Sequence, residues 1–505
     1  MKKSVAFISL LLIFFMQPVL GSSLSIAINR NSGSAVSFKV ANILQSNMVI
    51  QQNKPFRIWG NAPANEVIRI QADWMKKDKT VRADAEGKWL TSVGVPKAIR
   101  GNFDPHTITI TCANDMVRLR NILIGDVWIC SGQSNLTYQM DTTKGGKDGV
   151  LNFEKEIAEA DYPAIRLFTV GWAWEKKPQE DCKGKWEVCS PETVRRFSAV
   201  GYYFGRKLFQ QLQIPIGLVD NGMPAAGCQA FTRREILASD PEIKKKYLDP
   251  YEAKPEKKGE SILAILQRPS LIYNGMIYPV RHLSIRGFIW YQGESNRSDG
   301  MMYARLCKAM LKGWRHDFDQ GKLPFYFVQL PPYNWGKHDS TAYEYALLRE
   351  AQASMLKIKN TGMAVTLDVG DPDNLHPHNK KPVGIRLANI ALHKTYGFTH
   401  ILYRGPVFKK MKIEKDTVKI SFDRATIGNG LSTNNGQPPE YFFVAGADKI
   451  FHEAKARIAD DQVWLYSPEV HQPIAVRYAF TNYPLTNFEN KEGLPAQPFR
   501  TDHWK

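Results

Sequence analysis

The sequence predicts an α/β protein: a parallel, three-layer α/β core flanked by two modules made of β-strands. Residues 37–120 form short runs in which apolar and polar residues alternate, residues 121–400 alternate apolar runs with helical patterns, and residues 401–505 return to short apolar runs. Strands that alternate with helices favour a parallel sheet covered by helices, whereas evenly spaced short strands favour a sandwich. At 505 residues, the chain has room for two to four domains.

Residues 1–21 have the pattern of a signal peptide. Lys2 and Lys3 precede an apolar run over 5–16, and Val19-Leu20-Gly21 fits the small-residue rule for cleavage after Gly21. This run is too short to span a membrane comfortably, and no later run reaches the required length. The sequence therefore predicts export to the periplasm or beyond, without an integral membrane span.

The composition narrows the classes of ligand. The chain has 67 Lys and Arg against 49 Asp and Glu, a net charge of +18, which suits acidic glycans but also fits an ordinary solvated surface. No basic block with interleaved aromatic residues indicates nucleic-acid binding. The six cysteines have no zinc-site spacing, so no metal is expected, while Cys182 and Cys189 are close enough in sequence for a disulfide.

The segment 37–120 predicts an N-terminal β-domain of the sandwich type. Its short apolar runs, such as 56–59 and 107–111, are separated by turn residues at 85–87 and 114–115.

The segment 121–400 predicts the α/β core. Its helix candidates are 197–212, 302–314, 343–355 and 381–393, and the intervening strand candidates are 214–219, 324–330 and 363–367. Apolar residues recur with the helical period in the first set and run continuously in the second, as in buried parallel strands.

The segment 401–505 predicts a C-terminal β-module packed on the core. It contains three strand candidates, at 418–422, 463–466 and 474–478.

Two polar segments follow predicted strands in the core. The strand 122–129 is followed by residues 130–135, and the strand 285–289 by residues 290–296. Open α/β sheets bind ligands outside the carboxyl ends of their strands. Ser134 suits a hydroxyl nucleophile and Asn296 an amide donor to an oxyanion, so the pair indicates acyl transfer.

A base and its orienting acid are expected after the strand 363–367. His376 can take the proton of Ser134, and Asp373, three residues earlier, can fix the imidazole tautomer. His378 is the nearest rival to His376 as the base.

These segments resemble the block motifs of the SGNH hydrolase superfamily, and among them most closely the sialate O-acetylesterases and related carbohydrate acetylesterases. The matching motifs are Gly132-Gln133-Ser134-Asn135, Gln292-Gly293-Glu294-Ser295-Asn296 and Asp373-Asn374-Leu375-His376-Pro377. The resemblance covers nearly the whole mature chain. It implies a flavodoxin-like core with flanking β-sandwich-like domains, and ester hydrolysis without a cofactor.

The resemblance also implies a role for each site residue. Ser134 is the nucleophile and gives its own N–H to the oxyanion hole, and Asn296 gives its side-chain amide. His376 is the general base and then the acid. Asp373 orients it, with Asp371 as a credible substitute.

In this chain, the segment that matches the second block motif of the family departs from the family's usual pattern. The glycine pair that the family usually has falls on Pro224-Ala225. Proline has no N–H to donate, whereas Ala225 can donate to the oxyanion hole provided that its backbone does not require a positive φ. Gly222 and Gly227 are alternatives if the loop is reshaped.

The sequence thus predicts a secreted serine esterase that removes O-acetyl groups from sialic acids. Gln292 and Glu294 are expected to line the substrate site, although Glu294 can equally hold its loop together. Two alternatives stay open: an acetylesterase for plant or host polysaccharide such as xylan or pectin, and a glycan-binding protein built on a disabled hydrolase.

Overall fold

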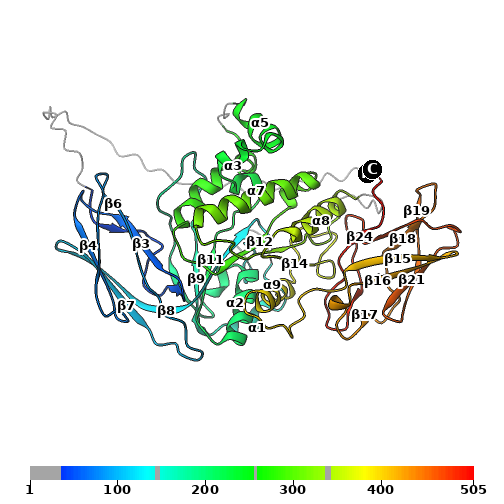
Figure 1. Cartoon of the computed structure of the whole chain (residues 1–505), viewed down its shortest axis with the longest axis horizontal. Coiled ribbons are helices and arrows are strands. Elements are labelled where there is room, and N and C mark those ends of the chain that lie inside the picture. Colours follow the sequence, from blue (N-terminus) through cyan, green and yellow to red (C-terminus); the bar gives the residue numbers. More distant parts are fainter. Residues whose placement is uncertain (1–35, 143–147, 255–258, 336–342, 505) are drawn as a thin grey trace, which may run out of the picture.

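The computed structural model describes residues 36–142, 148–254, 259–335 and 343–504. It is a mixed α/β protein with several sheets. Strand-rich regions lie at the two ends of the molecule, and helices and strands lie between them (Figure 1). The predicted signal peptide lies outside the described residues.

A mainly parallel sheet forms the centre. In spatial order its strands are β10 (Trp186–Cys189), β9 (Tyr162–Thr169), β11 (Ile216–Asp220), β8 (Asp115–Gly132), β12 (Gly287–Tyr291), β13 (Phe325–Val328) and β14 (Thr361–Ala364). Only the edge pair β10 and β9 is antiparallel. Apart from β9, which pairs in parallel with the outer side of β11, the parallel strands β8, β11, β12, β13 and β14 lie in the order 2-1-3-4-5, as in flavodoxin-like sheets.

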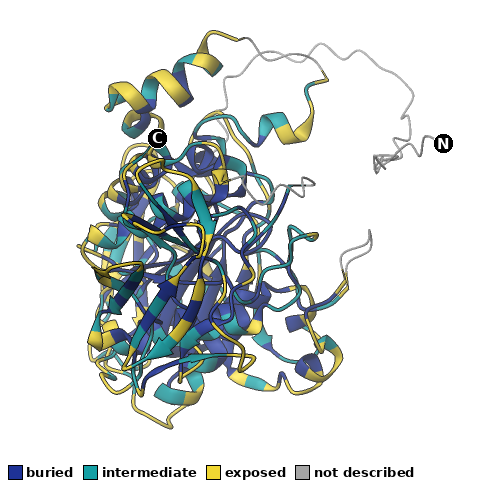
Figure 2. Ribbon diagram, turned by 90° about the vertical axis from the view of Figure 1, so that its right-hand side faces the viewer, coloured by how far each residue is buried: buried dark blue, intermediate teal, exposed yellow. Residues whose placement is uncertain are grey.

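Helices lie on both sides of this sheet, which explains its continuous apolar strands. On one side are α1 (Phe153–Ala158), α2 (Ala199–Leu212) and α9 (Lys381–Lys394), and on the other α7 (Met301–Phe318) and α8 (Glu344–Ser354) (Figure 1). The central strands are buried between them (Figure 2). All four helix candidates of the core are confirmed, with bounds shifted by up to four residues.

Short helices follow β11 and build the region around α7. They are α3 (Arg234–Ala238), α4 (Pro241–Ile243), α5 (Asp249–Glu252) and α6 (Ile262–Ile265).

The N-terminal region contains one separate sheet, made of β1 (Lys39–Val40), β3 (Phe56–Asn61) and β6 (Lys88–Val93). Its other strands are β2 (Val49–Gln51), β4 (Val67–Ala72), β5 (Lys79–Arg82) and β7 (His106–Cys112), and they join the central sheet through β8: β2 and β7 pair with β8, β4 with β7, and β5 with β4. Strand β8 belongs to this region and to the core, because its first part pairs with β7 and its last part with β11 and β12. The predicted boundary at 120/121 therefore falls within one continuous strand.

The C-terminal region is built from antiparallel strands. They are β15 (Phe408–Glu414), β16 (Thr417–Phe422), β17 (Leu431–Thr433), β18 (Phe442–Ala445), β19 (Phe451–Glu453), β20 (Lys455–Ala459), β21 (Gln462–Tyr466), β22 (Ala475–Tyr478), β23 (Phe488–Asn490) and β24 (Phe499–Arg500). Helix α8 contacts this region through Arg349, which donates to the carbonyl oxygens of Thr481 and Asn482, and through Glu350, which pairs with Arg500 at 2.9 Å.

The disulfide that the spacing of Cys182 and Cys189 allowed is not formed, because all six cysteines are free thiols in the structure. Cys189 is buried on β10, where its Sγ lies 3.7 Å from the carbonyl oxygen of Ala160. Strand pairing and burial thus satisfy this side chain without a disulfide. Within the described residues, no helix has the length and apolar character needed to cross a membrane.

Asp220, at the end of β11, makes stability depend on pH. Burial raises the pKa of its carboxyl to about 7, although its Oδ1 accepts an N–H from Gly222. The folded protein thus binds a proton that the unfolded chain releases near its ordinary pKa, so the folding stability falls as the pH rises from about 4 to about 7. We expect Asp220→Asn to reduce this slope by up to about 1.4 kcal/mol per pH unit, measured by urea unfolding at several pH values. An unchanged slope would contradict the assignment to Asp220.

Candidate active site

The predicted polar segments meet at the point where the sheet reverses its strand order. Strands β8 and β12 are neighbours and parallel, so their carboxyl ends lie at the same edge. After β8, the chain forms β9 and β11, which lie to one side of β8 within the sheet. It then forms β12, which pairs with the opposite side of β8. Such a switch point leaves a crevice beyond the strand ends, and Ser134 and the segment 292–296 follow these two ends.

Ser134 and His376 are in hydrogen-bond contact. The distance from His376 Nε2 to Ser134 Oγ is 2.8 Å, although the two residues are 242 positions apart in the sequence. Ser134 follows β8, and His376 lies in the loop after β14. This geometry allows the imidazole to take the hydroxyl proton as nucleophilic catalysis requires. It also favours His376 over His378 as the base.

The loop that carries His376 is shaped by side-chain contacts to its own backbone. Asn374 Oδ1 accepts the N–H of His376 at 2.9 Å, and Asp371 Oδ1 accepts the N–H of Asp373 at 2.9 Å. The carboxylate of Asp373 is exposed, and its Oδ1 accepts from Asn334 Nδ2 at 3.0 Å. Asp371 therefore holds the turn, while the orienting role of Asp373 stays a prediction.

Asn296 is buried, and both hydrogens of its side-chain amide are engaged. Nδ2 donates to Gln229 Oε1 at 3.0 Å and to Asp299 Oδ2 at 2.9 Å. The N–H of Cys228 donates to Oδ1 at 2.9 Å, which fixes the orientation of the amide. An oxyanion contact from Asn296 thus requires that one of the two donated bonds be exchanged. That role remains a prediction.

Ala225 has a left-handed backbone, with φ at 60°. This is the conformation that glycine adopts without cost and that other L-residues adopt at about 1–2 kcal/mol. Its carbonyl oxygen accepts from Ser295 Oγ at 2.9 Å, which holds the loop in this shape. No hydrogen bond from the N–H groups of Ala225 or Ser134 is found in the described part of the chain. The loop therefore keeps the glycine-like shape with an alanine. The condition set for Ala225, a backbone without a positive φ, is not met, so its role as an oxyanion donor stays a prediction, as does that of the Ser134 N–H.

Gln292 lies behind the nucleophile loop, fully buried. Its Nε2 donates to Gln133 Oε1 at 3.1 Å and to Asn296 Oδ1 at 2.8 Å. Gln133 Oε1 also accepts the N–H of Ser295 at 3.2 Å. These bonds join the loop after β8 to the loop after β12. Contact of Gln292 with substrate remains a prediction.

Asn135 joins the three loops of the site, a role that sequence reasoning missed. Its Nδ2 donates to Glu294 Oε1 at 2.5 Å and to the carbonyl oxygen of Leu375 at 3.0 Å, and its Oδ1 accepts from Lys380 Nζ. Lys380 and Glu294 are both buried. Burial raises the pKa of Glu294, against the opposing effects of the Asn135 bond and the Lys380 charge. The position of Asn135 beside Ser134, in the motif Gly132–Asn135, was the sequence signal that could have indicated this role.

Glu294 therefore takes part in loop packing, one of the two roles the sequence left open. Its predicted contact with substrate stays a prediction.

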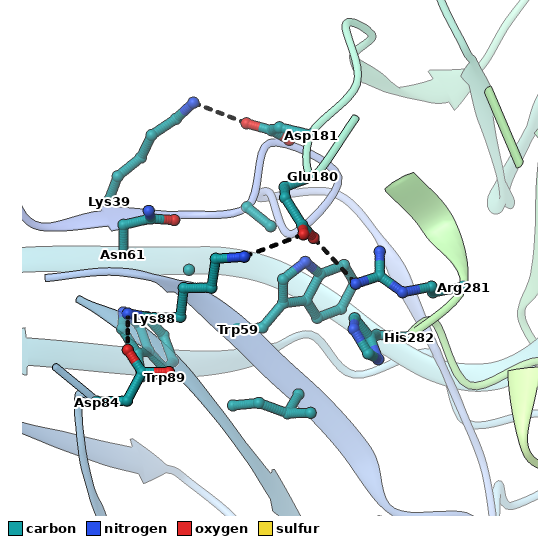
Figure 3. A pocket seen from close by; sticks show the side chains of 13 residues that line it. Lys39, Trp59, Asn61, Asp84, Lys88, Trp89, Glu180, Asp181, Arg281 and His282 are labelled. Atoms are coloured by element: carbon teal, nitrogen blue, oxygen red, sulfur yellow. Dashed lines mark hydrogen bonds and ion pairs between the residues drawn. The ribbon is translucent and has the colours of Figure 1, made fainter. Parts of the chain in front are cut away.

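Away from Ser134 and His376, a cavity of about 250 Å³ lies between the sheet of β1, β3 and β6 and the core (Figure 3). Glu180 sits between Lys88 at 3.2 Å and Arg281 at 2.9 Å. Burial, together with the charge of Arg281, lowers the pKa of His282 to about 4, so this imidazole is neutral at pH 7. The lining also contains Asp84 and Asp181, and Asp181 pairs with Lys39 at 2.7 Å.

No group of three or more His, Cys, Asp or Glu in the described ranges is arranged to hold a metal ion.

Ala225→Gly tests the strain in the oxyanion loop. Glycine adopts the left-handed backbone freely, so we expect the free energy of unfolding to rise by about 1 kcal/mol, measured by urea denaturation. Ala226→Gly is the matched control, because Ala226 is buried and is not among the residues with positive φ, and it should lower stability. Equal effects of the two changes would contradict strain at Ala225.

Asn135→Ala tests the junction of the three loops. It removes hydrogen bonds from a buried carboxylate and a buried ammonium group, so we expect about 3 kcal/mol of destabilisation in urea unfolding and a lower kcat. The neighbouring Asn379→Ala is the control and should change neither quantity by much. A loss below about 1 kcal/mol for Asn135→Ala would show that the loops do not depend on this side chain.

Comparisons with known proteins agree with this geometry. A family described as "Carbohydrate esterase, sialic acid-specific acetylesterase" matches residues 124–393. The sialate O-acetylesterase of Rattus norvegicus is 28% identical over 445 residues, which cover 78% of this chain and 80% of that protein. The Homo sapiens sialate O-acetylesterase is 27% identical over 533 residues, covering 95% and 96%.

A solved structure is also similar. The crystal structure of a carbohydrate acetylesterase from Xanthomonas citri has a TM-score of 0.81 and 31% identity, and the match covers 92% of this chain and 100% of that one. The family match spans more than half of the chain and includes Ser134, Asn296 and His376. The chain therefore belongs to the carbohydrate esterase family of sialic acid-specific acetylesterases and is a carboxylic-ester hydrolase.

Proposed function

We propose that this O-acetyl esterase is exported and removes acetyl groups from sialic acids through a Ser134-His376-Asp373 acyl-enzyme mechanism. The contact of 2.8 Å between His376 Nε2 and Ser134 Oγ carries the proposal, because it joins a nucleophile to a base at the switch point of the sheet. A three-layer, flavodoxin-like core is part of the same proposal, supported by the strand order 2-1-3-4-5.

Acylation begins when Ser134 Oγ attacks the acetyl carbonyl carbon and its proton moves to His376 Nε2. The carbonyl oxygen becomes an oxyanion, for which the N–H groups of Ser134 and Ala225 are the available donors. The tetrahedral intermediate collapses, the bond to the sugar oxygen breaks, and His376 gives its proton to that oxygen. The sugar leaves with a free hydroxyl group, and the acetyl group stays on Ser134.

Deacylation repeats these steps with water. His376 takes a proton from the water as it attacks the acetyl-enzyme, and the proton then returns to Ser134 as acetate leaves. Asp373 keeps the imidazole in the productive tautomer. The side chain of Asn296 adds a third oxyanion donor once its bond to Gln229 or Asp299 is exchanged. Loss of one oxyanion donor costs roughly 3–4 kcal/mol of transition-state stabilisation, so this exchange controls the rate.

The net charge of the chain and its predicted signal peptide support a sialic acid substrate outside the cytoplasm. Without Lys2 and Lys3 of the predicted signal peptide, 65 basic residues stand against 49 acidic ones, a net charge of +16 that attracts acidic glycans, and the pattern over residues 1–21 supports export. Acetylated xylan or pectin is the alternative substrate, because loops around the pocket, rather than the catalytic motifs, select the glycan. The Ser134–His376 contact favours an active enzyme over a glycan-binding protein that has lost catalysis.

Ser134→Ala tests the mechanism. We expect it to lower kcat for 4-nitrophenyl acetate by at least about a thousandfold, because no other group forms the acyl-enzyme. Ser298→Ala, at an exposed serine near the site, is the matched control and should retain the wild-type rate. Acetate release from O-acetylated sialic acid, acetylated xylan and acetylated pectin then identifies the substrate. Equal rates for the wild type and Ser134→Ala would exclude the serine mechanism.

A further inference from the structure

Two tryptophans stand exposed in the loop after β9. The side chains of Trp172 and Trp174 have exposed fractions of 60% and 41%, and no other tryptophan in the described ranges is exposed to this degree. By contrast Trp128, Trp186 and Trp290 are fully buried. Neither exposed indole packs against another aromatic ring of the described chain. Large apolar rings left in water mark a binding surface more often than a packing accident.

The surface around these two rings is hollowed on both sides of Trp174. A hollow of about 890 Å³ is lined by both tryptophans together with Asn42, Gln179 and Lys183. A second, of about 570 Å³, lies against Trp174, Gln179, Ile265 and Leu271. We call the two rings and these two hollows the tryptophan surface. The rim carries amides and lysines together with Glu175, Asp181 and Glu260. An apolar wall with such a polar rim suits a sugar, since a pyranose has an apolar C–H face and a hydroxyl edge.

The tryptophan surface lies at the catalytic edge of the sheet. Thr169, the last residue of β9, is in register with Asp220, and Asp220 is in register with Cys130 of β8. Neighbouring strands are about 5 Å apart, so Thr169 lies roughly 10 Å from Cys130. The tryptophan loop and the Ser134 loop follow these two positions at the same edge of the sheet.

The second hollow also connects to the oxyanion loop through the chain that lines it. The N–H of Glu175 donates to the carbonyl oxygen of Leu271 at 3.0 Å, which fixes the tryptophan loop against the segment that follows α6. Gln267, in that same segment, donates from Nε2 to the carbonyl oxygen of Ala225. Contacts thus lead from Trp174 to the loop that holds the proposed oxyanion donor.

The N-terminal region supplies part of the rim. Lys39 of β1 lines the larger hollow and pairs with Asp181 at 2.7 Å (Figure 3). Asn42 donates from its side chain to the carbonyl oxygen of Gly184 at 3.1 Å. The rim is therefore built by two regions of the protein and fixed by direct bonds, which suits a chain of sugars better than a single small molecule.

We infer that the tryptophan surface binds the oligosaccharide chain that carries the acetyl ester, so that the enzyme acts on acetylated oligosaccharides in preference to free acetylated sugars. Sugar units beyond the reacting one stack on Trp172 and Trp174 while the acetyl group lies at Ser134. Two experiments test this inference, one of binding and one of kinetics. The kinetic experiment rests on the proposed esterase function, whereas the binding experiment is independent of catalysis.

The binding arm uses the Ser134→Ala protein and two unacetylated probes, β-1,4-xylohexaose and an α2,8-linked sialic acid hexamer, followed by isothermal titration calorimetry. We expect one hexamer to bind, and adding Trp174→Ala to weaken its Kd about tenfold, as expected for the loss of one aromatic contact. The neutral and anionic probes distinguish the two glycan classes. Tyr466→Ala, an exposed aromatic in the C-terminal region, is the matched control and should leave the Kd unchanged.

The kinetic arm compares the same acetyl ester on the hexamer that binds, on its monosaccharide and on 4-nitrophenyl acetate. We expect Trp172→Ala and Trp174→Ala each to lower kcat/KM about tenfold on the acetylated hexamer, through KM, and to change the other two substrates less than twofold. Equal losses on all three substrates would overturn the inference, as would binding of neither hexamer.

Two further results would separate failure of the catalytic mechanism from failure of the binding surface. Hydrolysis that does not depend on Ser134, together with hexamer binding that depends on Trp174, would refute the proposed function and keep the binding surface. A double Trp172→Ala, Trp174→Ala protein whose mass in solution drops while hexamer binding is unchanged would show that the rings join two copies of the chain, and would overturn the inference.

Discussion

The active site depends on the side chain of Asn135, which joins three loops that arrive from distant parts of the sequence. Its amide donates to Glu294 and to the carbonyl oxygen of Leu375, and its oxygen accepts from Lys380. A buried carboxylate and a buried ammonium group are costly unless each is hydrogen-bonded, and Asn135 bonds both at once. The loop that presents His376 is thereby held to the loop that presents Ser134.

In the oxyanion region, one candidate hydrogen-bond donor is already bonded to other side chains, and two are not. The amide of Asn296 is committed to Gln229 and Asp299, whereas the N–H groups of Ala225 and Ser134 are open. Preorganised donors stabilise a developing charge without reorganisation, and a donor that must first break a bond contributes less. On the proposed mechanism, the open N–H groups therefore need less rearrangement than the amide of Asn296.

The sequence predicted much of the fold because local patterns reflect burial. The helix candidates of the core are close to α2, α7, α8 and α9, and the strand candidates at 214–219 and 324–330 overlap β11 and β13. Element ends were less predictable. The candidate 363–367 was placed too far along the chain, since β14 ends at Ala364 where its pairing with β13 stops. The disulfide that the spacing of Cys182 and Cys189 allowed is absent, because proximity in sequence says nothing about how strand β10 directs Cys189.

By itself, the sequence determined the fold class, the order of the three polar segments and the identities of Ser134 and His376 as nucleophile and base candidates. These follow from periodicity and residue chemistry, which are local properties. Only the tertiary structure decided that Ser134 and His376 are 2.8 Å apart, that Ala225 takes a left-handed backbone, and that Asn135 links the loops. The reason is physical: each depends on packing between segments far apart in the chain, where burial fixes a geometry that no local pattern encodes.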